Sequence, residues 1–158
     1  MNDHLNSMHD PDGSPACEGQ QTVLLVDNDH VRLKYMSEVL RRKGYGIAVF
    51  YDAPSAHHFS ILGVRRFDLV ITDYRLPGIN GLELVEALKR QHPDVPMVLL
   101  VEHGDIDSYS KAVDPGIFEY IIKPVNTFEL LRIVQEALGK GMPEQVPVVR
   151  KSVMAHAE

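Results

Sequence analysis

Five short apolar runs alternate with helix-like stretches along this chain. The runs are rich in Val, Ile and Leu, and they cover residues 22–26, 47–50, 69–72, 96–101 and 117–122. Runs of this length, bounded by polar residues or by Gly and Pro, are typical of buried strands. We therefore expect five strands in the interior of a sheet.

The stretches after the runs carry apolar residues at the spacing of an amphipathic helix. In the first stretch the expected inward stripe is Val31, Met36, Val39 and Leu40. Helices are expected over residues 29–43, 53–62, 82–91, 105–113 and, after a cap at Asn126 or Thr127, up to Leu138.

Strict alternation of strands and helices predicts an α/β fold with a parallel sheet covered on both faces. For five units the expected form is the flavodoxin-like, doubly wound sheet with strand order 2-1-3-4-5. We expect one domain over residues 22–140. Residues 1–21 are polar and read as a flexible leader, and residues 141–158 form a C-terminal tail.

Composition narrows the functional classes. The 158 residues carry a net charge of −6, which argues against nucleic acid or anionic membrane as a partner. No apolar stretch approaches the roughly 18 residues of a membrane helix. The first 21 residues lack the layout of a secretory signal, and the single Cys17 excludes a disulfide framework within one chain. These features predict a cytoplasmic protein.

The chemistry of the chain gathers where the predicted strands end. In the order 2-1-3-4-5, the carboxyl ends of strands one, three, four and five meet. Carboxylates suit Mg²⁺, and a lysine suits a phosphate oxygen, so the set predicts phosphoryl transfer to an aspartate, Asp73. The segments that converge are Asp27-Asn28-Asp29, Asp73, Val101-Glu102-His103 and Lys123-Pro124.

Three motifs at these strand ends carry a family resemblance. They are Val-Asp-Asn-Asp from residue 26, Thr-Asp-Tyr-Arg-Leu-Pro-Gly-Ile-Asn-Gly from residue 72, and Tyr-Ile-Ile-Lys-Pro from residue 120. Over residues 21–140 the chain resembles the receiver domain of bacterial two-component response regulators. Within that family it looks most like the receivers of enhancer-dependent transcription activators.

The resemblance implies a role for each matching residue. Asp73 would accept a phosphoryl group from a histidine kinase or phosphotransfer protein. Asp27 would belong to the acidic pair that holds Mg²⁺, with the backbone carbonyl of Arg75 as a further ligand. Lys123 would contact the phosphoryl group. Tyr120 would be the aromatic switch, or else only a strand aromatic.

One departure from the family pattern concerns the metal. The second member of the acidic pair is Asn28, which offers an oxygen but no charge. Because ligand charge strengthens the binding of hard cations, we expect weakened Mg²⁺ affinity. Asp29 either compensates in part or caps the first helix.

A second departure concerns the switch. Val101 stands where the family usually has Ser or Thr, and it has no hydroxyl to contact a phosphoryl group. Glu102 follows, where the family favours a small residue. Its carboxylate would repel a phosphoryl group unless Lys123 or Arg75 pairs with it, or it would supply the charge that Asn28 lacks. His103 is a candidate for influencing water attack on a phosphoaspartate.

Two functions follow from these residues. The first is a stand-alone regulator that accepts a phosphoryl group on Asp73 and acts through protein contacts, with at most self-dephosphorylation as an activity. It would form dimers or bind partners through the face at residues 105–122. The alternative is a phosphorylation-independent pseudo-receiver that serves as an interaction module. A flavodoxin-type electron carrier fits poorly, because the loop after the first strand is acidic and would repel a flavin phosphate.

Overall fold

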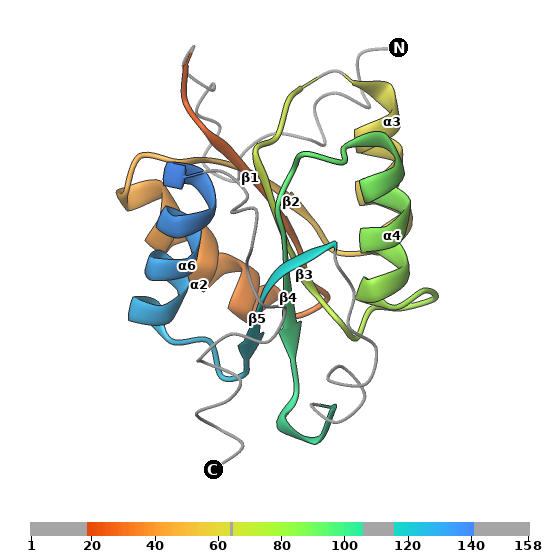
Figure 1. The fold of residues 1–158 in the computed structure, drawn as a ribbon. Coiled ribbons are helices and arrows are strands. Elements are labelled where there is room, and N and C mark those ends of the chain that lie inside the picture. The colour runs from red at the N-terminus through yellow and green to blue at the C-terminus, as the bar shows by residue number, and fades with distance from the viewer. Residues whose placement is uncertain (1–18, 64, 106–115, 141–158) are drawn as a thin grey trace.

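A parallel sheet of five strands forms the centre of the protein (Figure 1). The computed structural model describes residues 19–63, 65–105 and 116–140. The strand order is β2-β1-β3-β4-β5 and every neighbouring pair is parallel, which confirms the predicted topology. The strands are β1 (Thr22–Val26), β2 (Gly46–Phe50), β3 (Leu69–Asp73), β4 (Met97–Val101) and β5 (Ile117–Ile122).

Among the residues that the structure describes, two helices cover each face of the sheet (Figure 1). None of the helices in the described ranges is long and apolar enough to cross a membrane. Most of the helix expected at 105–113, and nearly all of the leader and tail, lie outside the described residues. The helices are α2 (His30–Arg42), α3 (Ala53–Leu62), α4 (Gly81–Gln91) and α6 (Thr127–Lys140), and a short 3-10 turn η1 spans His103–Asp105.

The side chains of each strand alternate between two apolar cores, as the period of two along a strand requires. Leu24 and Val26 pack on the side of α3 and α4, whereas Val23 and Leu25 pack on the side of α2 and α6. Continuing this alternation places Asp27 on the side of α2 and α6. In β3, Ile71 packs on that same side, so Asp73 follows it there. The two carboxylates therefore leave the sheet on the same face.

The inward face of α2 differs from the stripe predicted from the sequence. Val31 is 80% exposed, and the buried residues are Leu33, Met36, Ser37 and Leu40. The helix starts at His30 behind the N-cap Asp29. Val31 precedes Met36 by five residues, about 140° round the helix, so it points away from the sheet. Arg32, four residues before Met36, points toward the sheet instead.

The first residue of α4, directly after the turn from β3, has no room for a side chain. A Cβ atom added to Gly81 would lie 2.1 Å from the backbone oxygen of Asp73, because the helix starts directly against the end of β3. The Gly81 amide also donates to the carbonyl of Tyr74 at 2.7 Å. A glycine here lets α4 begin in contact with the strand that carries Asp73.

We predict that Gly81→Ala destabilises the protein by roughly 3 kcal/mol, because backbone must move to relieve the overlap. Urea unfolding followed by circular dichroism measures this. The matched control is Gly139→Ala in α6, where an added Cβ has no neighbour within 4 Å. Because alanine favours a helix over glycine by up to about 1 kcal/mol, the control should be neutral or stabilising. Equal effects of the two substitutions would contradict the steric explanation.

Candidate phosphoryl-acceptor site

Two buried carboxylates lie at the carboxyl ends of neighbouring strands. Asp27 follows β1 and is fully buried, and its amide donates to the carbonyl of Phe50 at 3.1 Å. Asp73 is the last residue of β3 and is 3% exposed. Since β1 and β3 pair directly, with Val26 opposite Thr72, the two side chains come together at one edge of the sheet. This is the position at which open α/β sheets place their binding sites.

An arginine from α2 bridges these two carboxylates. Its Nε donates to Oδ2 of Asp27 at 2.5 Å, and its Nη2 donates to Oδ1 of Asp27 at 2.9 Å. The same Nη2 donates to Oδ2 of Asp73 at 3.1 Å. Arg32 thus forms a two-pronged pair with one carboxylate and joins it to the second. A fourth, looser contact of 3.5 Å joins its Nη1 to a third carboxylate, that of Asp29.

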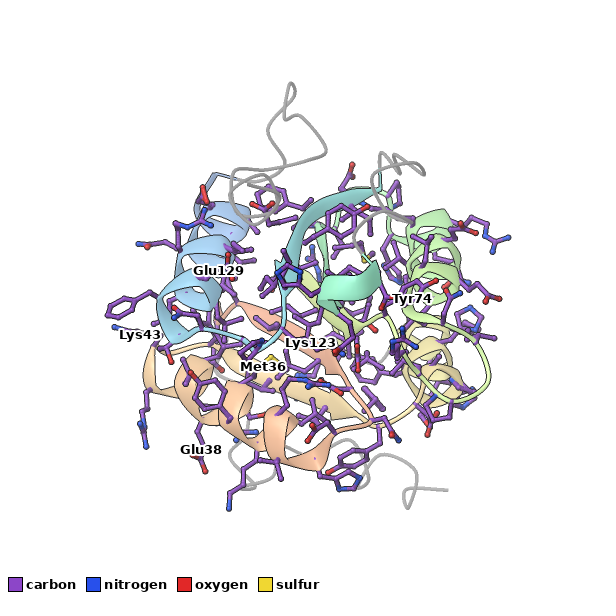
Figure 2. The ribbon with its side chains drawn as sticks, turned by 90° about the horizontal axis from the view of Figure 1, so that it is seen from below. Met36, Glu38, Lys43, Tyr74, Lys123 and Glu129 are labelled. Carbon is purple, nitrogen blue, oxygen red and sulfur yellow. The ribbon has the colours of Figure 1, made fainter. Side chains whose placement is uncertain are left out.

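Lys123 reaches the same site from the end of β5. Its Nζ lies 2.7 Å from Oδ1 of Asp73 and 3.0 Å from Oε2 of Glu102. The Lys123 amide donates to the carbonyl of Val101 at 2.9 Å, which ties the lysine to the end of β4. Figure 2 shows the molecule from below, with Lys123 near the middle between the helices on either side. Glu102 pairs with Lys123, which is one of the two conditions that the sequence left open.

Burial, hydrogen bonds and charge shift the pKa values of Asp27 and Arg32. Burial raises the pKa of the Asp27 carboxyl, and the hydrogen bonds from Arg32 and from the Asp29 amide offset this only in part. Burial by itself would lower the pKa of Arg32, but the hydrogen bonds and charge of Asp27 outweigh it and raise that pKa. The arginine is therefore a permanent cation next to a buried carboxylate, Asp27, whose ionisation is disfavoured by burial.

The other predicted members lie around the rim. The side chain of Arg75 is exposed and pairs with Asp105 at 2.8 Å, while its amide donates to Oδ1 of Asp73 at 3.2 Å. Its carbonyl stays a predicted metal ligand. Asn28 is exposed next to the site, and His103 is exposed at the start of η1.

Asp29 takes the role of a helix cap. Its carboxylate accepts the amides of Val31 and Arg32, and the amide of Arg32 is the first cause of its lowered pKa. The cap is the second of the two roles that the sequence left open for this residue.

The two predicted switch residues lie on the other face of the sheet. Val101 and Tyr120 belong to the core under α3 and α4, and they are 1% and 3% exposed. Tyr120 is therefore already directed inward in this structure. Register pairs it with Leu99, two residues before Val101 on the same face.

Sequence reasoning missed Arg32, although one signal for it was present. A cation in the first turn of a helix opposes the helix dipole, which favours acidic residues there. The first turn of α2 contains no acidic residue, and Arg32 stands in it. Such a cation needs nearby carboxylates, and Asp27 and Asp29 precede it by five and three residues.

Comparison with known proteins identifies the family. The family described as response regulator receiver domain matches residues 23–135. Because the match covers most of the chain and the fold and strand-end residues agree with it, the protein belongs to the receiver-domain family. Receiver domains act in two-component signalling, where phosphorylation on an aspartate is their general function, and they generally bind Mg²⁺ for it.

Curated relatives are regulatory proteins. The chain is 33% identical over 118 residues to the nitrogen assimilation regulatory protein NtrX of Azorhizobium caulinodans, which covers 73% of this chain and 26% of that protein. It is 31% identical over 137 residues to the C4-dicarboxylate transport transcriptional regulatory protein DctD of Rhizobium meliloti, covering 87% of this chain and 29% of that protein. The chain thus spans less than a third of the length of these relatives.

Solved structures show the same fold. The signal receiver domain of an HD domain-containing protein from Pseudomonas fluorescens matches with a TM-score of 0.69 and 31% identity, over 77% of this chain and 96% of that one. A CheY-like receiver domain protein from Methanospirillum hungatei matches with a TM-score of 0.69 and 25% identity, over 77% and 95%.

The residues present fit a magnesium ion only in part. Asp27 and Asp73 supply the oxygens that a hard cation prefers. Both oxygens of Asp27 and one of Asp73, however, accept hydrogen bonds from Arg32. Among the residues that the structure describes, no group of three or more His, Cys, Asp or Glu side chains could hold a metal. With Arg32 in this position, the site does not fit the ion.

We predict that the carboxyl of Glu102 titrates below its ordinary range, because a hydrogen bond from Lys123 and then the lysine's charge lower its pKa. Lys123→Gln should return it to the ordinary range. Arg75→Ala should leave most of the shift in place. A pH titration by NMR of the side-chain carboxyl measures all three.

The lowered pKa of Glu102 makes the stability of the fold depend on pH. The pair stabilises the fold above the ordinary pKa of Glu, and this contribution is lost as the pH falls through the lowered value. An unshifted Glu102 in the unmodified chain would contradict the pairing with Lys123.

Proposed function

We propose that Asp73 of this chain accepts a phosphoryl group from the phosphohistidine of a histidine kinase or phosphotransfer protein. The observation that supports this best is the contact of 2.7 Å between Asp73 and Lys123, made where two strands of a receiver sheet end. In the transfer, the bond between phosphorus and the donor histidine nitrogen breaks. A bond between phosphorus and a carboxylate oxygen of Asp73 forms.

The cations on either side of Asp73 would also stabilise the phosphoryl group after its transfer. Lys123 and Arg32 pair with opposite oxygens of the Asp73 carboxylate, Oδ1 and Oδ2. Once that carboxylate becomes an acyl phosphate, its charge moves outward to the phosphoryl oxygens. The lysine ammonium and the arginine guanidinium both bind such oxygens well. We expect these two cations to follow the charge and to neutralise it.

Magnesium affinity is proposed to be weak. Asn28 supplies an amide where a second carboxylate would add ligand charge, and hard cations bind more weakly to fewer charges. Glu102 is engaged with Lys123, so it does not stand free to replace the missing carboxylate.

The partners follow from the family. Receiver domains interact with histidine kinases and with downstream effectors. The alternative of a phosphorylation-independent module is not favoured, since Asp27, Asp73 and Lys123 converge as a phosphoryl site requires. A homodimer through residues 105–122, the absence of nucleic acid and membrane partners, and a cytoplasmic location stay predictions of the sequence.

We predict that incubation with acetyl phosphate and Mg²⁺ adds one phosphoryl group to the chain, as measured by intact-mass spectrometry. Asp73→Asn should abolish the gain, because an amide is not a nucleophile for this transfer. The matched control is Asp94→Asn, an exposed aspartate before β4, which should be phosphorylated like the unmodified chain. No gain in the unmodified chain, even at high Mg²⁺, would overturn the proposal and favour a binding module.

A further inference from the structure

We propose that the guanidinium of Arg32 occupies the position between Asp27 and Asp73 that a metal ion would take, so that Arg32 and Mg²⁺ exclude each other. The inference concerns the regulation of the proposed receiver site. It does not require that Asp73 be phosphorylated.

One nitrogen atom of Arg32 contacts both carboxylates. Nη2 of Arg32 donates to Asp27 at 2.9 Å and to Asp73 at 3.1 Å, so it lies between an oxygen of each carboxylate. A magnesium ion shared by these oxygens would lie about 2.1 Å from each of them. Such an ion would occupy the space that the guanidinium already fills. Either the arginine side chain leaves or the ion stays out.

The charge balance leads to the same conclusion. Asp27 and Asp73 are buried and carry two negative charges when ionised, and Arg32 and Lys123 supply two positive charges. Without Arg32, the three remaining groups would have a net negative charge that attracts a divalent cation. With Arg32 in place these four groups are neutral, so the arginine lowers the attraction of the site for Mg²⁺ by one unit of charge. The exposed carboxylates of Glu102 and Asp29, which contact Lys123 and Arg32, are present in both cases and do not change this difference.

The position of Arg32 on its helix argues against a merely incidental contact. Arg32 lies in the first turn of α2, where the positive end of the helix dipole disfavours a cation. Its side chain is 21% exposed and reaches into the site, although solvent is available beside it. The contacts with Asp27 and Asp73 offset that unfavourable location.

Calorimetric titration of the folded chain with MgCl₂ alone tests the inference. We expect Arg32→Ala to bind Mg²⁺ more tightly than the unmodified chain, by about tenfold or more. Arg42→Ala is the matched control, since it removes the same charge from the far end of the same helix and should leave the affinity unchanged. An affinity of Arg32→Ala within about twofold of the unmodified chain would overturn the inference.

A second substitution separates Arg32 from the missing acid. Asn28→Asp restores a carboxylate at an exposed position but leaves Arg32 in place. If the arginine limits binding, this change alone should gain less than about threefold, and the double variant with Arg32→Ala should bind most tightly. A gain from Asn28→Asp equal to that from Arg32→Ala would show that the amide is the limit, and the inference would fail.

The shift of the thermal unfolding midpoint on addition of Mg²⁺ can be measured even for a variant that is less stable than the unmodified chain. Removing Arg32 leaves Asp27 buried without its partner, so Arg32→Gln, which keeps a neutral donor, accompanies Arg32→Ala. We expect saturating MgCl₂ to raise the midpoint of either variant clearly more than that of the unmodified chain. Equal shifts in all of them would overturn the inference. Neither measurement uses a phosphoryl donor, so the result stands apart from the acetyl phosphate experiment.

Discussion

The cost of burying two carboxylates side by side governs this site. Asp27 and Asp73 lose their water at the end of a sheet, and two like charges there repel each other unless cations compensate them. The protein supplies compensation from two directions, with Arg32 on α2 and Lys123 after β5. The ends of β1, β3 and β5 and the start of α2 are thereby held together by charge as well as by their apolar cores. A change in any one of the four groups alters the electrostatic environment of the other three.

Because side chains alternate along each strand, the charged site residues and the two predicted switch residues lie on opposite faces of the sheet. The carboxylates continue the face that packs against α2 and α6, whereas Val101 and Tyr120 lie in the core beneath α3 and α4. A hydroxyl at residue 101 would have offered a polar contact near the end of β4, and the valine offers only packing. The inward position of Tyr120 is therefore stabilised by the apolar core on its own face.

Either a metal ion or an arginine can compensate the repulsion between the carboxylates of Asp27 and Asp73. A divalent ion brings two charges and exchanges with solvent, whereas a guanidinium brings one charge that is covalently attached and always present. Asn28 lowers the negative charge of the acidic loop by one. The amide of Asn28 and the guanidinium of Arg32 act in the same direction, because each lowers the attraction of the site for a cation from solution. Asp73 and Lys123 lie where the resemblance to receivers implied a phosphoryl acceptor and its lysine, and the difference that we propose lies in how charge is balanced around them.

The sequence by itself determined the order of the strands and of the described helices, the topology of the sheet, and the convergence of Asp27, Asp73, Glu102 and Lys123. Those features follow from apolar periodicity and from the rule that parallel strands end at one edge, and neither depends on side-chain detail. Only the tertiary structure decided the phase of α2, which turned Val31 outward and Arg32 into the site. It also decided that Asp29 caps the helix and that Glu102 pairs with Lys123. A rotation of one or two residues about a helix axis changes which side chain meets a buried charge. The spacing of Leu33, Met36 and Leu40 is compatible with the observed rotation, but the contact of Arg32 with Asp27 and Asp73 follows only from the packing of α2 against the sheet.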